Sequence, residues 1–273
     1  MSSKLVPSDP AKVMVIRDVV PRTITTFSTP FWRFGRVKIG GRGTVVRLQS
    51  GALAVFSPVA LTDEVKQKVA ELGEVKYIAA LDIEHHIFLG PWHQAYPSAQ
   101  VLGPSGLVEK RTKQKNEDVP FAFAFSPDKP ITSISPEFDA EFDWEYVSAH
   151  VNKELVFNHK PTRTLIQADL LFNLPATEQF SKTGVDASSG ILTKIFGALQ
   201  NTRGTAIWQK RMAWYGISKG EGGRSAFNKS IERIDKWQFD RIVPCHGDVI
   251  EGNGKAIFEK VFGWNLEAAK EGN

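Results

Sequence analysis

The sequence contains one cysteine, Cys245, so neither an intrachain disulfide nor a cysteine-rich zinc module can form. It also lacks any stretch of the roughly 20 apolar residues that a membrane-spanning helix needs. No long apolar run precedes Lys12, where a secretory signal would be expected. These absences predict a soluble, cytoplasmic protein with no membrane partner.

Dense clusters of basic residues are also lacking, although the net charge is +4 and the isoelectric point is near 9.0. The densest basic run, residues 110–115, is short. It is either a patch for acidic partners or, as we interpret it, a solvated linker or helix end. No nucleic-acid recognition motif is present, so we expect no nucleic-acid partner.

What is present is the composition of a globular protein, with 42% hydrophobic and 23% charged residues over 273 positions. This length allows one large domain or two small ones. We predict a flexible tail over residues 1–12, where Pro7 and Pro10 interrupt the chain, and a single domain over residues 13–273.

The pattern of apolar residues predicts an α/β fold. Gly40-Gly41 separates two alternating runs, residues 35–39 and 43–48, which indicates a hairpin. An apolar strand over residues 51–56, a helix from Thr62 to Gly73 and a second strand over 75–81 predict a parallel βαβ unit. Further strands are expected at 13–16, 24–27, 100–103, 154–157, 164–168 and 241–244, with short helices at 92–96 and within 172–230 and a terminal helix at 255–270. Residues 104–145 are expected to form loops and short strands.

The candidate chemistry lies where predicted strands end, because sites of α/β proteins gather at the carboxyl ends of strands. Asp82, Glu84 and His85 follow the apolar strand 75–81. Their oxygen and nitrogen atoms suit Zn²⁺, Fe²⁺ or Mn²⁺. An exposed loop with a buried histidine is the alternative explanation of the same residues.

Two further strands end in polar residues. Asp169 closes the strand 164–168 within apolar sequence, so it requires either a structural partner such as Arg163 or a metal. His246 ends the strand 241–244 before Gly247, a residue that permits a sharp turn. Cys245, next to it, is expected to face the core.

His150 and His159 lie on either side of the strand 154–157. Both can approach one site only if that strand is very short. One is therefore a ligand candidate, and the other is a surface residue or a support behind the ligands.

With these positions in place, the chain resembles the metallo-β-lactamase superfamily. The resemblance implies a four-layer αβ/βα sandwich that binds metal at one edge through an HxHxDH motif, a histidine, an aspartate and a final histidine. The motif falls on Ala80, Asp82, Glu84 and His85, and the later positions fall on His150, Asp169 and His246.

The resemblance is more specific to a branch of that superfamily described only as a domain of unknown function. The matching stretches are residues 55–62, 84–91, 154–165 and 241–248. The residues around 152–154 and 174–178 are similar to those of fungal members.

The resemblance implies one divalent metal, Zn, Fe or Mn, rather than two, because Ala80 cannot be a ligand. The implied ligands are Glu84, His85, Asp169 and His246, completed by Asp82 or His150; His86 and His159 are the alternatives.

The implied activity is metal-dependent hydrolysis of a small-molecule ester, lactone, amide or phosphoester, in which Asp82 or Asp169 orients or deprotonates water. Two alternatives use the same fold: an iron- or manganese-dependent non-hydrolytic enzyme, and a catalytically silent binding module. The sequence leaves the substrate and the oligomeric state open.

Overall fold

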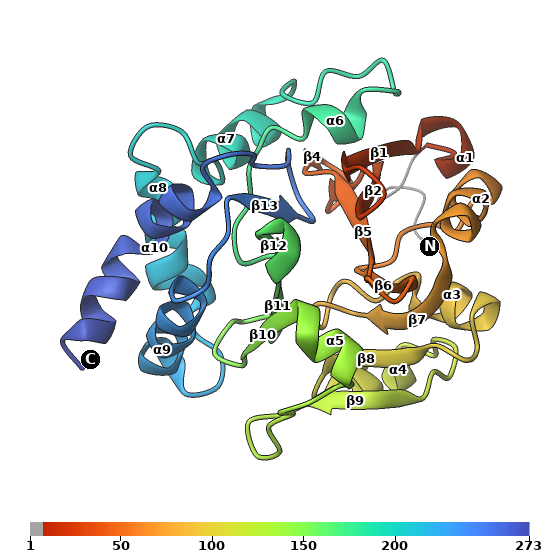
Figure 1. Cartoon of the computed structure of the whole chain (residues 1–273). Coiled ribbons are helices and arrows are strands. Elements are labelled where there is room, and N and C mark those ends of the chain that lie inside the picture. Colours follow the sequence, from red (N-terminus) through yellow and green to blue (C-terminus); the bar gives the residue numbers. More distant parts are fainter. Residues whose placement is uncertain (1–7, 273) are drawn as a thin grey trace.

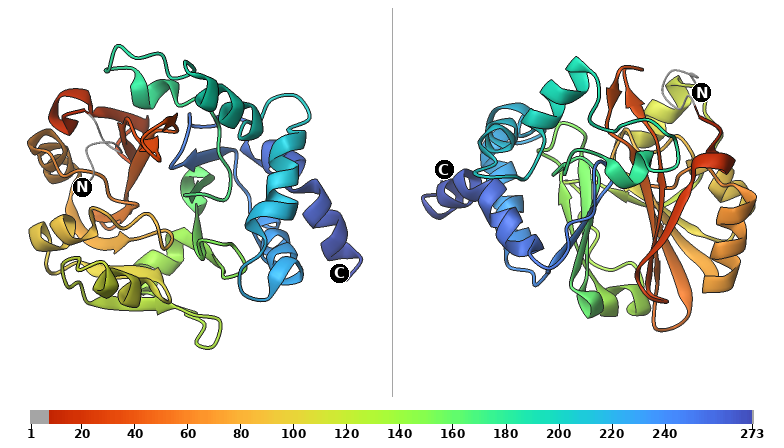
Figure 2. Two further views of the ribbon diagram at one scale, coloured as in Figure 1. Left: turned by 180° about the vertical axis from the view of Figure 1, so that it is seen from behind. Right: turned by 90° about the horizontal axis from the view of Figure 1, so that it is seen from above.

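Two β-sheets pack face to face, and helices cover the outer face of each, so the molecule has four layers (Figures 1 and 2). The computed structural model describes residues 8–272. Of the tail expected over residues 1–12, residues 1–7 lie outside this range, and Pro10–Val13 form the short helix α1. Within the described range, no helix has both the length and the hydropathy required to cross a bilayer.

The first sheet has seven strands in the order β1-β2-β5-β6-β7-β8-β9. Pairing is antiparallel from β1 to β6 and parallel from β6 to β9. The strands are β1 (Val15–Val20), β2 (Ile24–Thr29), β5 (Gly41–Arg47), β6 (Ala52–Phe56), β7 (Glu74–Ala79), β8 (Gln100–Pro104) and β9 (Phe121–Phe125).

The second sheet has four strands in the order β10-β11-β12-β13, and only its last pair is parallel. A small hairpin of β3 and β4 stands beside the first sheet. These strands are β10 (Phe142–Val147), β11 (Glu154–His159), β12 (Thr164–Gln167), β13 (Arg241–Pro244), β3 (Trp32–Arg33) and β4 (Val37–Lys38).

The helices form the outer layers and the connections, as Figure 1 shows. Those that follow strands of the first sheet are α2 (Asp63–Leu72), α3 (Leu89–Ala95) and α4 (Leu107–Lys113). The others are α5 (Pro136–Glu141), α6 (Thr177–Phe180), α7 (Ile191–Leu199), α8 (Ile207–Arg211), α9 (Gly223–Asp235) and α10 (Gly254–Lys270), with a 3₁₀ turn η1 (Lys160–Thr162) and a π-helical segment η2 (Met212–Ile217).

Three of the four apolar clusters formed by the described residues hold the layers together. The central core lies between the sheets, where Phe56, Phe142 and Phe157 contact one another. The other two pack the helices on the outer faces of the sheets. Full burial of such a side chain contributes roughly 1.5–3 kcal/mol. The expected four-layer αβ/βα sandwich is therefore confirmed.

The βαβ unit forms as predicted: Thr62 caps α2 by accepting from the backbone N–H of Val65, and the helix ends at Gly73. The hairpin expected across Gly40-Gly41 is wrong. Strand β4 pairs with β3, and β5 pairs with β2 and β6. The backbone N–H groups of Ile39 and Gly40 both donate to Phe31 O, which closes the small hairpin before the chain enters the large sheet.

Loops from both sheets meet at one edge of the molecule. Residues 80–88 leave the carboxyl end of β7, residues 168–176 leave β12, and residues 245–250 leave β13. Strand β11 runs antiparallel to β12, so its amino end lies at the same edge. Hydrogen bonds from Ile83 N to Asn152 O and from Leu155 N to Leu81 O join the two sheets there.

Candidate metal site

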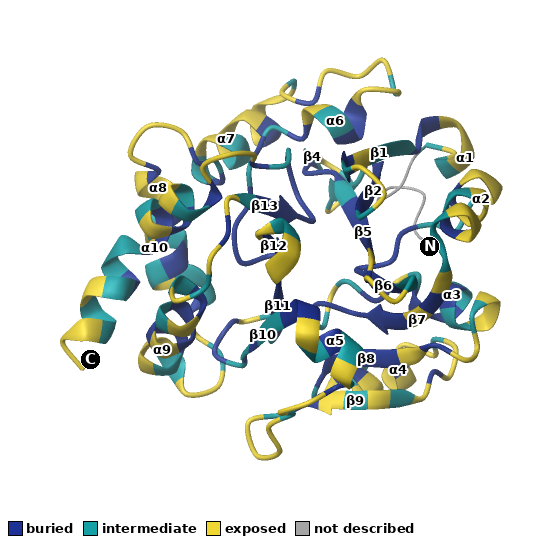
Figure 3. Ribbon diagram, viewed as in Figure 1, coloured by how far each residue is buried: buried dark blue, intermediate teal, exposed yellow. Residues whose placement is uncertain are grey.

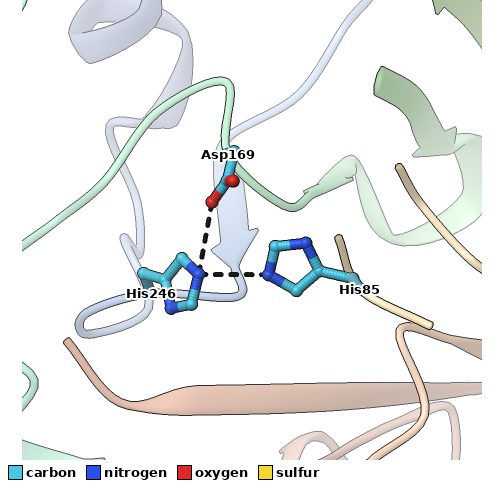
Figure 4. Close-up of side chains that lie close together, drawn as sticks. All are labelled: His85, Asp169 and His246. Atoms are coloured by element: carbon cyan, nitrogen blue, oxygen red, sulfur yellow. Dashed lines mark hydrogen bonds and ion pairs between the residues drawn. The ribbon is translucent and has the colours of Figure 1, made fainter. Parts of the chain in front are cut away.

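Three segments far apart in the sequence bring His85, Asp169 and His246 together at this edge (Figure 4). The Nε2 atoms of the two imidazoles are 3.0 Å apart. His246 Nε2 is also 3.2 Å from Asp169 Oδ1. One potential ligand atom from each residue therefore lies within 4.8 Å of the other two.

The orientation of His246 is fixed by the backbone. Its Nδ1 lies 2.7 Å from Gly40 O, and because a carbonyl only accepts, Nδ1 must donate. The neutral ring then carries its lone pair on Nε2, which faces the cluster. A hydrogen bond of this kind behind a histidine is the usual support of a metal ligand.

The orientation of His85 is fixed by Asp82, which is fully buried. Asp82 Oδ1 lies 2.9 Å from His85 Nδ1 and accepts the backbone N–H groups of Glu84 and His85, both at 2.7 Å. The carboxylate thus fixes both the loop and the ring. His85 Nε2 is left to face His246.

With both rings neutral, two nitrogen lone pairs and a carboxylate oxygen would converge on one point. They repel one another unless a proton or a cation lies between them. Burial alone would lower the pKa of His85, but the charges of Asp82 and Asp169 outweigh burial and raise that pKa to about 10. The same negative field that holds a proton on His85 would attract a divalent cation in its place.

Asp169 presents one oxygen to the cluster and fixes the other. Its Oδ2 accepts from Asn152 Nδ2 at 2.7 Å. Its Oδ1 is buried and receives no hydrogen bond from any described residue. Burial acts to raise the pKa of Asp169, but the charge of His85 and the contact with His246 hold it well below its usual range. An orphaned carboxylate oxygen facing two imidazole nitrogens fits a Zn²⁺, Fe²⁺ or Mn²⁺ ion.

Glu154, which is fully buried, supports Asp169 from behind. Its two carboxylate oxygens accept the backbone N–H groups of Ala168 and Asp169 at 2.8 and 3.0 Å. Burial raises the pKa of Glu154 well above its ordinary value, and the charges of Asp82 and Asp169 raise it further. The loop after β12 is therefore held by a glutamate at the start of β11.

His150 lies behind this loop and outside the three-residue cluster. Its Nδ1 accepts from Asn152 N at 3.2 Å and is 3.7 Å from Glu154 Oε2. Its Nε2 is buried and has no hydrogen-bond partner among the described residues. Burial lowers the pKa of His150, so the ring is neutral at neutral pH.

The other candidates from the sequence lie elsewhere. Glu84 is exposed, and its carboxylate pairs with Lys110 Nζ at 2.6 Å. His86 is buried against Arg111, and burial together with the charge of Arg111 lowers its pKa to about 4. His159 lies at the far end of β11, where its ring contacts Glu141 and Thr162. Of the implied ligands Glu84, His85, Asp169 and His246, the structure thus brings three together.

Sequence reasoning missed Glu154, Asn152 and the carbonyl of Gly40. Glu154 could have been found from the sequence, because a glutamate that begins the apolar strand 154–157 needs a hydrogen-bond partner if it is buried. The role of the Gly40 carbonyl could not have been found in this way, since its partner His246 is 206 residues away.

Two features flank the cluster. A cavity of about 300 Å³ opens beside His85 and His246, and its wall is mainly apolar, with Phe31, Phe34 and Phe88 contributing. On another side, the buried guanidinium of Arg42 donates to the carbonyls of residues 244 and 247 at 2.7 and 2.6 Å. Arg42 therefore holds the turn that carries His246.

Gly247 is required in this turn. Its φ is +88°, and a Cβ at this position would lie 2.1 Å from Asn173 O. The close approach lets residues 173 and 247 pair as an isolated bridge.

In three dimensions the chain is similar to several metalloproteins. It is 12% identical to the DIM-1 metallo-β-lactamase exposed to ceftazidime, with a TM-score of 0.57 over 95% of this chain and 100% of that one. It is 9% identical to FIM-1 from Pseudomonas aeruginosa in its mono-zinc form, with a TM-score of 0.55 over 96% and 99%. It is also 10% identical to the metal-soaked Flv1 flavodiiron core from Synechocystis sp. PCC6803, with a TM-score of 0.59 over 94% of this chain and 62% of that one.

At these identities the similarity shows the fold, which is that of the metallo-β-lactamases. No protein of curated function is similar enough in sequence to give a match. The model of the family described as Domain of unknown function (DUF4336) matches residues 31–183, more than half of the chain, including His85 and Asp169. The chain therefore belongs to the DUF4336 family.

Proposed function

We propose that this protein is a hydrolase that depends on one divalent metal ion held by His85, Asp169 and His246. The observation that carries the proposal is the convergence of two oriented imidazole nitrogens and an orphaned carboxylate oxygen beside a cavity. FIM-1 shows that a single-metal form exists on this fold.

The residues around the ion would have different roles in hydrolysis. A divalent ion supplies Lewis-acid polarisation of a carbonyl or phosphoryl oxygen and allows water to act as a nucleophile at neutral pH. Asp169 would hold the ion through Oδ1, the carboxylate oxygen that faces the cluster, and so fix where the bound water lies, while Asn152 holds its other oxygen. Asp82 acts as a positioning residue, since its Oδ1 holds His85 and the loop. The apolar cavity would accept the apolar part of a small ester, thioester or lactone.

The first test is metal content combined with hydrolysis. Full-length protein should purify with about one equivalent of Zn, Mn or Fe per chain, and that metal should raise its melting temperature. His246→Ala should lose both the metal and any hydrolysis of a panel of nitrophenyl esters, thioesters and lactones. The control is His93→Ala, which removes a half-buried histidine of α3 that is not part of the cluster. Trace metal in the wild type, with no shift of melting temperature on adding any of the three ions, would refute the proposal.

One observation favours a second candidate, an iron-dependent non-hydrolytic enzyme. Two histidines and one carboxylate form the ligand set typical of non-haem Fe(II) sites. Protein purified with iron that consumes oxygen with a reductant, and that hydrolyses nothing in the panel, would select this candidate over the hydrolase.

A further inference from the structure

Eight of the eleven exposed large hydrophobic residues in the described chain belong to two segments, residues 31–38 and 182–215. On α7, Ile191, Leu192 and Ile195 are 77, 50 and 55% exposed. The outward turns of this helix are exposed along its length (Figure 3). The remaining five are Phe34, Val185, Ile207, Trp208 and Tyr215.

The two segments are joined. Lys38 Nζ donates to the carbonyls of Asp186 and Ser189, and the backbone N–H of Lys38 donates to Thr193 on α7. Helix α7 in turn contacts α8. We call the two segments together the α7 surface.

The α7 surface is almost free of acidic residues. Its two segments contain eight Lys or Arg and one acid, Asp186, so the remaining chain holds 26 basic and 29 acidic residues. Two of the cations, Lys194 and Arg203, line a second cavity of about 300 Å³ against α7. The positive charge of the whole protein is therefore concentrated where the apolar residues are exposed.

We propose that the α7 surface binds the surface of an anionic membrane, with Ile191, Leu192 and Ile195 inserted among the lipids. An apolar helix face that carries Lys, with a tryptophan on the contacting helix α8, is the composition of interfacial helices. Arg211 stacks on Trp208 at 4.7 Å, which places a cation and an aromatic ring together as at a membrane interface. This departs from the sequence-based expectation of no membrane partner, and it does not rest on the proposed function.

Charge argues against the other obvious occupant, a second copy of the chain. A two-fold interface places the same patch on both subunits. Two α7 surfaces would therefore bring basic residues against basic residues without acids to pair them. Anionic lipid compensates the same charge, and each basic residue near such a surface strengthens binding by roughly fivefold.

Sedimentation with lipid vesicles tests the proposal. Wild-type protein should bind vesicles of phosphatidylcholine with 30% phosphatidylserine at least tenfold more tightly than vesicles of phosphatidylcholine alone. The triple variant I191S/L192S/I195S and the charge variant K194E/R203E should each weaken binding by roughly tenfold or more. The control V108S/V151S removes two exposed valines outside the α7 surface and should bind like wild type. His246→Ala should also bind like wild type.

Melting temperatures near that of the wild type establish that each variant is folded. Absence of wild-type binding to phosphatidylserine vesicles overturns the proposal, and so does equal binding by the triple variant. A wild-type oligomer that the triple variant disperses, with no vesicle binding by either, would assign the α7 surface to a second copy instead.

Discussion

The two ends of the second sheet each bury a histidine beside a carboxylate, yet the two sites differ. At the far end, His159 Nε2 is 3.2 Å from Glu141 Oε2, and its Nδ1 is 2.7 Å from the hydroxyl of Thr162. Each ring nitrogen therefore has a polar partner within hydrogen-bond distance. At the other end, His85 and His246 turn their Nε2 atoms toward each other and toward Asp169.

The comparison separates a structural histidine from a candidate ligand. His159 and His246 are both buried and the His85 side chain is only 17% exposed, so burial does not distinguish the two kinds. What distinguishes them is whether each ring nitrogen faces a complementary hydrogen-bond partner. His159 has a partner for each ring nitrogen, whereas the facing nitrogens and carboxylate oxygen of the cluster need a proton or a cation between them.

The largest expected effect is the loss of metal affinity when a histidine of the cluster is removed. His85→Ala should reduce metal affinity by more than roughly 100-fold, because loss of an outer-shell partner alone costs 10–100-fold. The unfolding free energy of the metal-free protein should also fall, by roughly 1–3 kcal/mol, because the variant leaves the buried carboxylates of Asp82 and Asp169 without the protonated ring. Competition with a chelating dye and urea unfolding measure the two quantities. Unchanged metal affinity would remove His85 from the site.

Removal of the histidine at the far end of the sheet should have the opposite outcome for metal affinity. His159→Ala should leave metal affinity unaltered and lower the unfolding free energy by about 2–3 kcal/mol. It deletes a fully buried ring and leaves Glu141, itself only 6% exposed, without its histidine partner. The same two assays apply. Metal loss in this variant would mean that the two ends of the sheet are not independent.

A smaller change sharpens the role of Asp82. Asp82→Asn keeps an oxygen that can accept the backbone N–H groups of residues 84 and 85 but removes the negative charge behind His85. Metal affinity should fall by roughly tenfold, the lower end for an outer-shell residue. A fall as large as that of His85→Ala, measured with the same dye, would instead make Asp82 a direct ligand.

The sequence identified much of this arrangement because strand ends are visible in it. His85, Asp169 and His246 each follow an apolar run, and parallel strands carry their carboxyl ends to one edge. The direction of Glu84 could not be read, because it depends on how Asp82 folds the loop and on Lys110, which is 26 residues away. The pairing of β4 was also hidden, since its alternating pattern fits either neighbour.

The smallest expected effect is a change in the unfolding free energy as the pH falls. Burial lowers the pKa of His159, although Glu141 opposes this, and it also lowers the pKa values of His86 and His150. The unfolded chain, with histidine pKa values near 6.5, then binds more protons than the folded chain as pH falls below that value, so stability must decrease. Each such histidine contributes a slope of at most about 1.4 kcal/mol per pH unit.

Urea unfolding of metal-free protein between pH 7.5 and 5.5 measures this slope. The raised pKa of His85 acts in the opposite sense, because it costs stability as pH rises from about 6.5 towards 10. Comparison of His159→Gln with wild type isolates one group: the variant should lose less stability on acidification. If instead the variant is destabilised equally at both pH values, the pKa of His159 is the same in the folded and the unfolded chain, and Glu141 balances the effect of burial. Complementarity of hydrogen-bond partners, rather than charge, would then separate the far end of the sheet from the cluster.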